Sequence, residues 1–237
     1  MFTSGVVTRR IRCLNAHPSA SLREYLQAFF ACAPDVAASI VQRAIDRRYP
    51  VKALMLKQGD CADSTFLLII GRAHALTHGV DGQMVLLHEY LPGDFFGAIT
   101  QAAPAPEKAD VVAVEDVRVA AFLALDFLTL IETHGCVGLA VSRTLLRQLR
   151  ASADRIVERT TLSAKGRVSA ELLRLARLGD GRTVRPAPVL AALAVHVHST
   201  RETVSRAINA LERRGIIRRD ADTLTIVAPH RLEEMIV

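Results

Sequence analysis

Several features are scarce or missing in this 237-residue sequence, and each absence excludes something. Tryptophan is absent and aromatic residues make up only 5% of the chain, so a core must be built mainly from aliphatic side chains. No run of 18 uncharged apolar residues occurs, which argues against a transmembrane helix. The charged N-terminal residues are followed by no apolar run, so we expect no secretory signal. We therefore expect a folded cytoplasmic protein with no membrane partner.

Cysteines are few and widely scattered, and no C-x-x-C pair occurs. We interpret them as mostly reduced thiols of a cytoplasmic protein. The residues alone leave a redox role open for any one of them. They are Cys13, Cys32, Cys61 and Cys136.

Catalytic signatures are missing as well. The sequence has no Ser-His-Asp spacing, no Cys/His metal-ligand pattern and no phosphate-binding loop. His74 and His78 lie four residues apart on one expected strand, with His88 on its partner. A cupin-like metal enzyme, an alternative from another class, typically uses a His-x-His pair and a nearby Glu, which this region lacks. We therefore expect no enzyme, no metal site and no certain cofactor.

The charge is unevenly distributed along the chain. Residues 1–136 hold 12 Lys/Arg against 14 Asp/Glu, a net charge of −2, whereas residues 137–237 hold 18 against 10, a net charge of +8. Nearly all of the basic excess is therefore C-terminal. This distribution is typical of a domain whose partner carries phosphates, and it points to double-stranded DNA.

The first half changes its hydrophobic period near residue 50. Helical spacing runs from Ser21 to about Arg48, with an interruption at Pro34. Short apolar runs separated by turn signals follow, and Asp81-Gly82 between two of them indicates a hairpin. Many short strands of this kind are typical of a β-barrel or sandwich. The runs are Ala53–Leu56, Phe66–Ile70, Ala73–Thr77, Met84–Leu87, Val111–Val114 and Val117–Leu123.

A long proline-free stretch follows, from Val137 to Thr161. Four residues within it alternate at spacings of four and three, as in a coiled coil. This pattern favours a helix that pairs with a second copy, and an amphipathic helix packed on its own domain is the alternative. We call these four residues the seam: Leu145, Leu149, Ser152 and Ile156.

The last third has the pattern of a winged helix. A helix is expected over residues 199–213, ended by Gly215, and a short helix before it completes a helix-turn-helix. Ser199 and Glu202 have the spacing of a capping box, and a hairpin around residues 220–223 forms the wing. The other expected segments are a hinge at Leu162–Gly166, helices at Arg167–Leu178 and Val189–Val195, and an extended link at Val184–Pro188.

The expected 199–213 helix has two different faces. An apolar stripe at i, i+3, i+4 and i+7 should face inward. The opposite face carries donors and acceptors able to read base edges in a major groove, although most charged helix faces are only solvated. The inward residues are Val204, Ala207, Ile208 and Leu211, and the outward residues are Arg201, Glu202, Ser205, Arg206 and Asn209.

Two sets of residues resemble one family of bacterial proteins. The string Ser-Thr-Arg-Glu-Thr-Val-Ser-Arg at 199–206 is similar to the recognition helix of the CRP/FNR family. Gly59, Gly71, Gly93 and Gly97 are spaced as in the cyclic-nucleotide-binding β-roll, where tight turns need glycine. The resemblance implies an α+β fold with a jelly-roll-like β-roll, a long dimerisation helix and a winged helix-turn-helix. The implied domains are an arm at 1–20, a sensor β-roll with flanking helices at 21–136, a linker and dimerisation helix at 137–162, and a DNA-binding domain at 163–237.

The same resemblance implies a homodimeric, sequence-specific transcription regulator that reads a pseudo-palindromic site and contacts RNA polymerase. An arginine can donate bidentately to guanine and a glutamate can accept from cytosine, and each such contact discriminates by about 1–3 kcal/mol. Capping alone is the alternative role for Glu202. The matched base-reading residues are Arg201, Glu202, Ser205 and Arg206, and the expected phosphate contacts are Ser199, Thr200, Thr203, Arg218 and Arg219.

The ligand-binding part departs from the family pattern. In its cyclic-AMP binders a glutamate that holds the ribose follows the last glycine, whereas Ala98 follows Gly97 here. An Arg-Ser pair holds the cyclic phosphate in those proteins, and Glu107-Lys108 stand in its place. We therefore expect an effector other than cyclic AMP bound in the usual way. The alternative is a ligand-free β-roll controlled by abundance or thiol redox. The candidate pocket residues are Gly97, Ala98, Lys108 and Ser152.

Overall fold

The protein has two compact units. The computed structural model describes residues 21–79, 84–99 and 105–236. Its contacts divide the chain into one unit of Met1–Gln83 and Leu87–Arg150 and another of Met84–Leu86 and Ala151–Val237. The predicted N-terminal arm, Cys13 and the predicted turn at Asp81-Gly82 lie outside the described residues.

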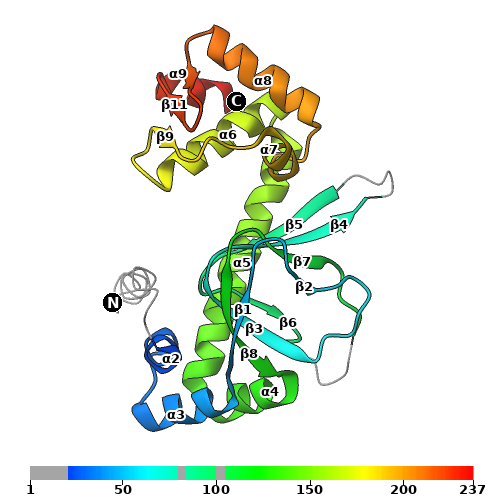
Figure 1. Cartoon of the computed structure of the whole chain (residues 1–237), viewed down its shortest axis with the longest axis vertical. Helices are drawn as coiled ribbons and strands as arrows, with labels where there is room; N and C mark the ends of the chain where they lie inside the picture. Colours follow the sequence, from blue (N-terminus) through cyan, green and yellow to red (C-terminus); the bar gives the residue numbers. More distant parts are fainter. Residues whose placement is uncertain (1–20, 80–83, 100–104, 237) are drawn as a thin grey trace. The chain divides into compact units, whose positions relative to one another are not determined.

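The first unit is built on two four-stranded sheets whose described pairings are antiparallel (Figure 1). One sheet has the strand order β1-β8-β3-β6, and the other has the order β2-β7-β4-β5. The strands are β1 Ile45–Tyr49, β2 Leu54–Leu56, β3 Ser64–Ile70, β4 Ala73–His78, β5 Met84–Tyr90, β6 Phe95–Gly97, β7 Asp110–Ala113 and β8 Val117–Leu123.

Strand β3 shows how the sheets build the core. Successive side chains of a strand point to opposite faces, and β3 is buried on both. Phe66 and Leu68 join a cluster that contains residues of both sheets. Leu67 and Ile69 join a second cluster with residues of the flanking helices. The continuous apolar run in the sequence therefore corresponds to an inner strand covered on both sides.

Helices cover one face of the β1-β8-β3-β6 sheet. Phe29 of α2, Phe127 of α4 and Val141 of α5 are buried in one cluster with residues of β3 and β8. A capping box starts α2, in which the Glu24 N–H donates to the Ser21 hydroxyl and the Ser21 N–H donates to the Glu24 carboxylate. The helices are α2 Leu22–Phe30, α3 Pro34–Arg43, α4 Ala124–Thr133 and α5 Gly135–Thr161.

The helix predicted to reach about Arg48 ends earlier. Helix α3 ends at Arg43, and Ile45–Tyr49 form strand β1, which pairs along its whole length with β8. Arg118 of β8 donates from its guanidinium to the Asp46 carboxylate at 2.8 Å and reinforces this pairing. The helical spacing in the sequence was misleading because pairing with a distant strand decides the backbone conformation there.

Two of the framework glycines are needed for steric reasons. Gly71 and Gly97 have φ of 87° and 83°, where side chains are strained. A Cβ on Gly71 would lie 2.4 Å from the Asp116 carbonyl oxygen, and one on Gly97 would lie 2.4 Å from the Ser64 carbonyl oxygen. Both positions therefore exclude any other residue without a backbone shift.

Helices α4 and α5 meet at a bend of 111°. In its first part, α5 buries Val137, Val141 and Thr144. Within residues 21–79, 84–99 and 105–236, no single helix is long and apolar enough to cross a membrane. By length and composition, the bent pair of α4 and α5 passes that test only when the two are taken together.

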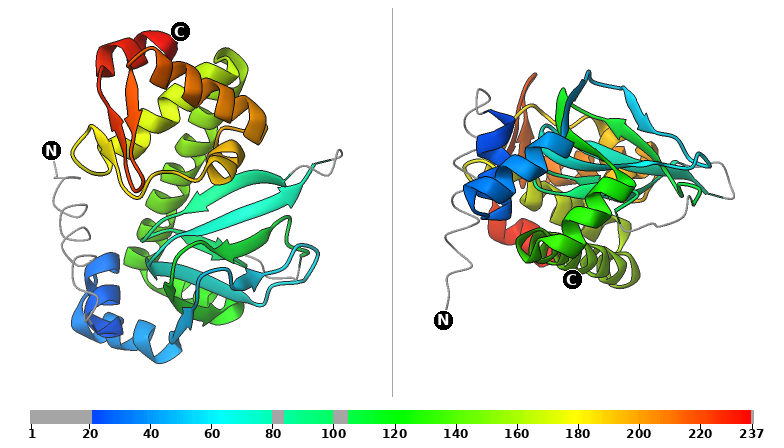
Figure 2. Two further views of the ribbon diagram at one scale, coloured as in Figure 1. Left: turned by 45° about the horizontal axis from the view of Figure 1, so that its top comes forward. Right: turned by 90° about the horizontal axis from the view of Figure 1, so that it is seen from below.

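The second unit contains a helix-turn-helix and a small sheet, drawn mostly in yellow, orange and red in Figure 2. The sheet has the order β10-β11-β9, and its residues join those of the helices in one core cluster. Its elements are α6 Ala164–Arg177, β9 Thr183–Val184, α7 Leu190–His196, α8 Arg201–Arg213, β10 Ile217–Arg219, β11 Leu224–Ile226, α9 Pro229–Glu233 and the 3-10 turn η1 Glu234–Ile236.

Two predicted segments of this unit differ from the structure. The expected hinge at Leu162–Gly166 is shorter, because Ser163 caps α6 by accepting from the Gly166 N–H at 3.1 Å. Val184, the first residue of the expected extended link, is the last residue of strand β9 and pairs with Leu224 of β11. The wing is therefore a three-stranded sheet rather than a simple hairpin.

Candidate nucleic-acid interface and candidate effector pocket

Helix α8 has one buried face and one exposed face. Val204, Ile208 and Leu211 are completely buried in the core of the second unit, as the spacing of the apolar stripe predicts. Gly215 takes a φ of 64° after the helix, and the next N–H, of Ile216, donates back to the Leu211 carbonyl at 3.0 Å. The core and this C-terminal turn hold α8 in one orientation within its unit.

Thr200 caps the start of α8, so the predicted capping box of Ser199 and Glu202 is wrong. Thr200 has an extended backbone, and its hydroxyl accepts from the Thr203 N–H at 3.2 Å. Ser199 closes the turn instead, because its N–H donates to the Ala194 carbonyl at 3.0 Å. The N-cap therefore lies one residue later than predicted, and Glu202 is not part of a capping box.

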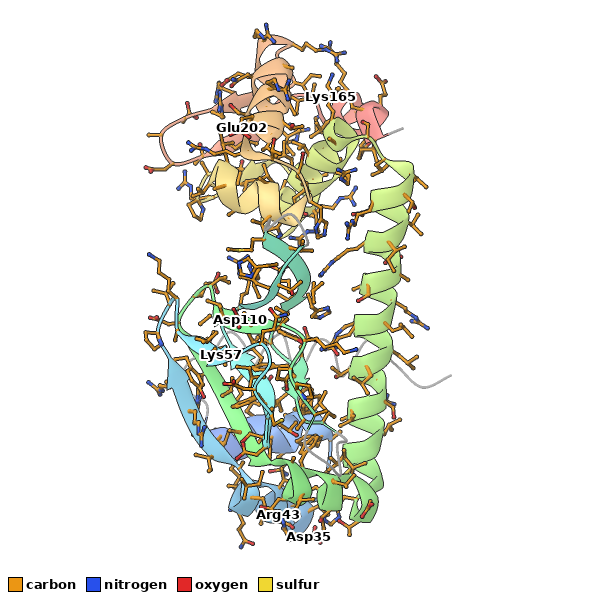
Figure 3. The ribbon with its side chains drawn as sticks, turned by 90° about the vertical axis from the view of Figure 1, so that its right-hand side faces the viewer. Asp35, Arg43, Lys57, Asp110, Lys165 and Glu202 are labelled. Atoms are coloured by element: carbon orange, nitrogen blue, oxygen red, sulfur yellow. The ribbon has the colours of Figure 1, made fainter. Side chains whose placement is uncertain are left out.

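The outward face of α8 is open to solvent within its unit. Arg201, Glu202 and Arg206 are exposed, and Ser205 is half-buried. Glu202, labelled in Figure 3, keeps its pKa below its usual range because its own backbone N–H and the Thr200 hydroxyl favour the carboxylate, aided by the two arginines. Glu202 is therefore ionised at neutral pH, the state in which it acts as an acceptor.

The two arginines of the wing strand β10 have different surroundings. Arg218 is exposed, and a carboxylate oxygen of Asp220 lies 4.0 Å from its Nε. Arg219 donates from its Nε to Glu212 of α8 at 3.1 Å and from its terminal nitrogen to the Asn209 side-chain oxygen at 2.8 Å. The sequence predicts the same phosphate role for both arginines and does not reveal the partners of Arg219, because no local pattern indicates a contact between a helix and the wing.

The turn between α7 and α8 carries His198 among cationic side chains. Arg167 donates to the Val197 carbonyl at 2.8 Å and to the His198 carbonyl at 3.4 Å, and His198 has a φ of 49°. Burial first, and then Arg159, Arg155 and Arg167, lower the pKa of His198 to about 4. The imidazole is therefore neutral at pH 7, so His198 adds no positive charge for a DNA phosphate.

His198→Asn should reduce the acid sensitivity of this unit. A histidine with a depressed pKa stays neutral in the folded state while the unfolded chain takes up a proton, so stability is lost as pH falls from about 6.5 towards about 4. Asparagine tolerates the positive φ and does not titrate. Between pH 7 and pH 5, the urea midpoint should therefore fall less for His198→Asn than for the wild type. An equal fall, with the exposed His230→Asn as control, would contradict this assignment.

Helix α5 exposes part of the seam. Leu145, Leu149 and Ile156 are exposed, the last two by 65% and 63%. Leu146 and Val157 beside them are also exposed. An apolar strip of this kind on a helix is typical of an unpaired interface.

Other residues of α5 are hydrogen-bonded to the segment that leads into the candidate pocket. The Gly93 carbonyl accepts from Thr144 at 3.3 Å and from Arg147 at 3.0 Å, and Arg147 also pairs with Asp94 at 2.7 Å. Gln148 donates to the Phe95 carbonyl at 3.0 Å. We call this set of contacts the clamp. It joins three consecutive residues before Gly97 to one helical turn of α5, and no pattern in the sequence indicates it.

The candidate pocket carries an acid and a buried methyl group. Ala98 is buried, and its carbonyl accepts from the Thr65 hydroxyl at 2.8 Å. Glu107 is half-buried, and burial raises its pKa. Burial first, and then the charge of Glu107, raise the pKa of Tyr90 to about 12. Lys108 is exposed.

The four predicted pocket residues are thus only partly described as one site. Gly97 and Ala98 form the end of β6 and the turn after it. Ser152 lies on α5 within the second unit, so its relation to the other three stays a prediction. Of the described residues named here, Ala98 and Glu107 offer no cationic side chain to a phosphate, whereas the exposed Lys108 carries one.

Comparisons with known proteins identify the family. A cyclic nucleotide-binding domain model matches residues 46–134, and a Crp-like helix-turn-helix domain model matches residues 166–235. The Cyclic AMP receptor protein of Thermus thermophilus is 32% identical over 202 residues, which cover 85% of this chain and 91% of that relative. The chain belongs to the CRP/FNR family. This confirms the family predicted from the sequence.

Similar solved structures confirm the predicted fold. FixK2 from Bradyrhizobium japonicum is similar with a TM-score of 0.68 and 20% identity, covering 81% of this chain and 96% of that one. The c-di-GMP responsive regulator CLP of Xanthomonas campestris is similar with a TM-score of 0.72 and 16% identity, covering 82% and 99%. At these identities the likeness concerns the fold alone.

Family membership also decides the broad function. CRP/FNR proteins are transcriptional regulators and not enzymes, so the prediction of a non-enzymatic regulator is confirmed. Helix-turn-helix regulators of this family bind DNA and typically dimerise. The roles assigned to single residues of this CRP/FNR protein stay predictions.

Proposed function

We propose that this CRP/FNR protein is a homodimeric, sequence-specific DNA-binding regulator whose helix α8 enters the major groove. The observation that carries this proposal is the exposed face of a helix whose other face is locked in a core. Arg201 and Arg206 can donate to guanine, and ionised Glu202 can accept from cytosine. The Ser205 hydroxyl can hydrogen-bond to either kind of base pair. These four residues would read the bases of each half-site.

Phosphate contacts would surround this reading face. Ser199, Thr200 and Thr203 lie at the N-terminal end of α8, where backbone N–H groups and hydroxyls suit phosphate oxygens. Arg218 on the wing is exposed and adds positive charge. Such contacts contribute affinity and salt dependence rather than sequence preference.

Dimerisation through the seam would make the operator symmetric. The exposed seam leucines supply apolar area for a second copy, and Ser152 is the polar position among them. A two-fold dimer places two recognition helices in successive major grooves about 34 Å apart. The clamp supports coupling between α5 and the candidate pocket. A shift of residues 93–95 would move the α5 side chains that are hydrogen-bonded to them.

Selection from random DNA tests the proposed function. The purified wild-type protein should enrich a pseudo-palindrome with two half-sites one helical turn apart. Genome-wide mapping of bound sites should then return the same motif. Transcription with RNA polymerase on a promoter that carries the motif tests the proposed contact with polymerase. Enrichment of no motif, or of a single unpaired half-site, would contradict the proposal.

The effector is proposed to differ from cyclic AMP bound in the usual way. Glu107 stands in place of the arginine that holds the cyclic phosphate in the family's cyclic-AMP binders, and Ala98 offers no side-chain acceptor to a ribose. The Thermus relative is named for cyclic AMP and the Xanthomonas neighbour for c-di-GMP, so both kinds of nucleotide are the compounds to test. Thermal shift with each should show no stabilisation by cyclic AMP. A clear rise in the melting temperature with cyclic AMP at micromolar concentration would overturn this part.

Control by thiol oxidation is the second candidate, and the packing of two cysteines favours it. Cys32 and Cys136 pack against the same core cluster of the first unit. Burial first, and then Cys136, raise the pKa of Cys32. Hydrogen peroxide can oxidise the two thiols to one disulfide with release of two water molecules.

Peptide mapping after peroxide treatment separates this candidate from simple damage. We expect a disulfide between Cys32 and Cys136, reversible by dithiothreitol, and abolished in Cys32→Ser. The exposed Cys61 serves as the control, because Cys61→Ser should leave that disulfide unchanged. If Cys61 alone is oxidised, or if disulfides form only between chains, the second candidate fails.

A further inference from the structure

The wing is tied to the recognition helix by a set of hydrogen bonds centred on Arg219. Its backbone N–H donates to the Glu212 carboxylate at 3.3 Å, its Nε donates to the same carboxylate at 3.1 Å, and its terminal nitrogen also contacts Glu212. The terminal nitrogen further donates to the Asn209 side-chain oxygen at 2.8 Å. We call Asn209, Glu212 and Arg219 the bracket.

The neighbouring arginine provides an internal comparison. Arg218 and Arg219 are consecutive on β10, so their side chains point to opposite faces. The Arg218 side chain is 70% exposed, whereas that of Arg219 is 34% exposed. Glu212 lies against Arg219, and its pKa is lowered mainly by this hydrogen-bonded guanidinium. The charge of Arg219 is therefore matched within the protein, while that of Arg218 faces solvent.

The bracket also orients a residue of the outward face. Asn209 lies four residues after Ser205, one helical turn along the proposed reading face. Because its side-chain oxygen accepts from Arg219, its NH₂ group is the part left to donate to an acceptor on DNA. The planar guanidinium of Arg219 thus fixes strand β10 relative to the Glu212 carboxylate and the Asn209 amide of α8.

We propose that Arg219 is a positioning residue that fixes the wing and the Asn209 amide relative to α8, rather than a phosphate contact. This inference rests on the proposed function, because the positioned elements are those that meet DNA. It replaces the phosphate role that the sequence suggested for Arg219. Specificity, and not charge-driven affinity, should therefore depend on Arg219.

The test compares Arg218→Ala with Arg219→Ala on the selected operator and on one-base variants of it. Arg218→Ala should lower the slope of log affinity against log salt by about 0.9 for each phosphate that the protein no longer neutralises, with discrimination unchanged. Arg219→Ala should leave the slope unchanged and reduce discrimination by roughly two- to fivefold, the range of a half-exposed ion-pair network. A reduced slope in Arg219→Ala, equal to that of Arg218→Ala, would overturn the proposal.

Glu212→Gln gives the sharpest discrimination between the two roles. If Arg219 is a positioning residue, Glu212→Gln should weaken base discrimination as much as Arg219→Ala does, and the double variant should be no worse. If Arg219 contacts phosphate, removing its carboxylate partner should free it, and affinity and salt slope should both increase. The second result would overturn the inference.

A measurement without DNA keeps the bracket testable even if the proposed function fails. Hydrogen exchange of the backbone amides in residues 217–226 should become faster in Arg219→Ala and Glu212→Gln, but not in Arg218→Ala. Equal exchange in all variants would show that the bracket does not hold the wing. A wild-type protein without any sequence preference would instead contradict the proposed function alone.

Discussion

Leu149→Glu should leave the protein monomeric at concentrations at which the wild type forms the proposed dimer. Leu149 is 65% exposed in the single chain and lies on the seam. Burying a leucine contributes about 1.5–3 kcal/mol, and a two-fold interface contains it twice. Two glutamates brought together add repulsion. The dimer dissociation constant should therefore rise by about a hundredfold or more, at 1.4 kcal/mol for each factor of ten.

Sedimentation and DNA titration together measure this effect. A monomer binds two half-sites independently and lacks the high effective concentration that links them, so operator affinity should fall with dimerisation. Leu125→Glu is the matched control, since Leu125 is 66% exposed but lies on α4 and off the seam. A Leu149→Glu variant that remains a dimer would show that another surface forms the interface.

Arg206→Ala should relax base preference at one position of each half-site. The exposed guanidinium donates to the Thr203 hydroxyl at 3.3 Å, a long hydrogen bond within one turn of α8 that a base could replace. A bidentate contact to guanine discriminates by about 1–3 kcal/mol, so its removal should reduce the preference by roughly five- to 150-fold. Preference at the other positions should persist, because Arg201 and Glu202 remain in place.

Competition among operators that carry each of the four base pairs at that position measures the change. Arg213→Ala is the matched control, because Arg213 is an exposed arginine in the last turn of the same helix. This control should lose some affinity without a change in base preference. An unchanged footprint and unchanged preference in Arg206→Ala would refute the assigned reading face.

The start and the end of α8 show how much of the structure the local sequence pattern predicts. The apolar stripe correctly predicted which residues are buried, and Gly215 correctly marked the end of the helix. The cap was predicted one residue too early, at Ser199 instead of Thr200. Both residues have a hydroxyl, and only the path of the turn after α7 decides which one accepts from the helix.

Strand β1 shows where local pattern fails. Residues 45–48 continue the helical spacing of α3, yet they pair with residues 118–121 of β8. The energy that selects the strand comes from backbone hydrogen bonds to a segment far along the chain, as in the pairing of Ile45 with Ala121. Helical periodicity in a short segment cannot report such a partner.

The sequence by itself determined the family, the two domain types and the two faces of the recognition helix. Those features follow from periodicity, caps and glycines, whose causes lie within a few residues. Only the tertiary structure decided the partners of Arg219, the packing of Cys32 and Cys136 against one core cluster, and the clamp between Gly93 and α5. Each of these joins side chains from separate elements, and their distances are set by packing of the whole unit. The recognition helix is therefore encoded locally, whereas the contacts proposed to position and control it are products of the fold.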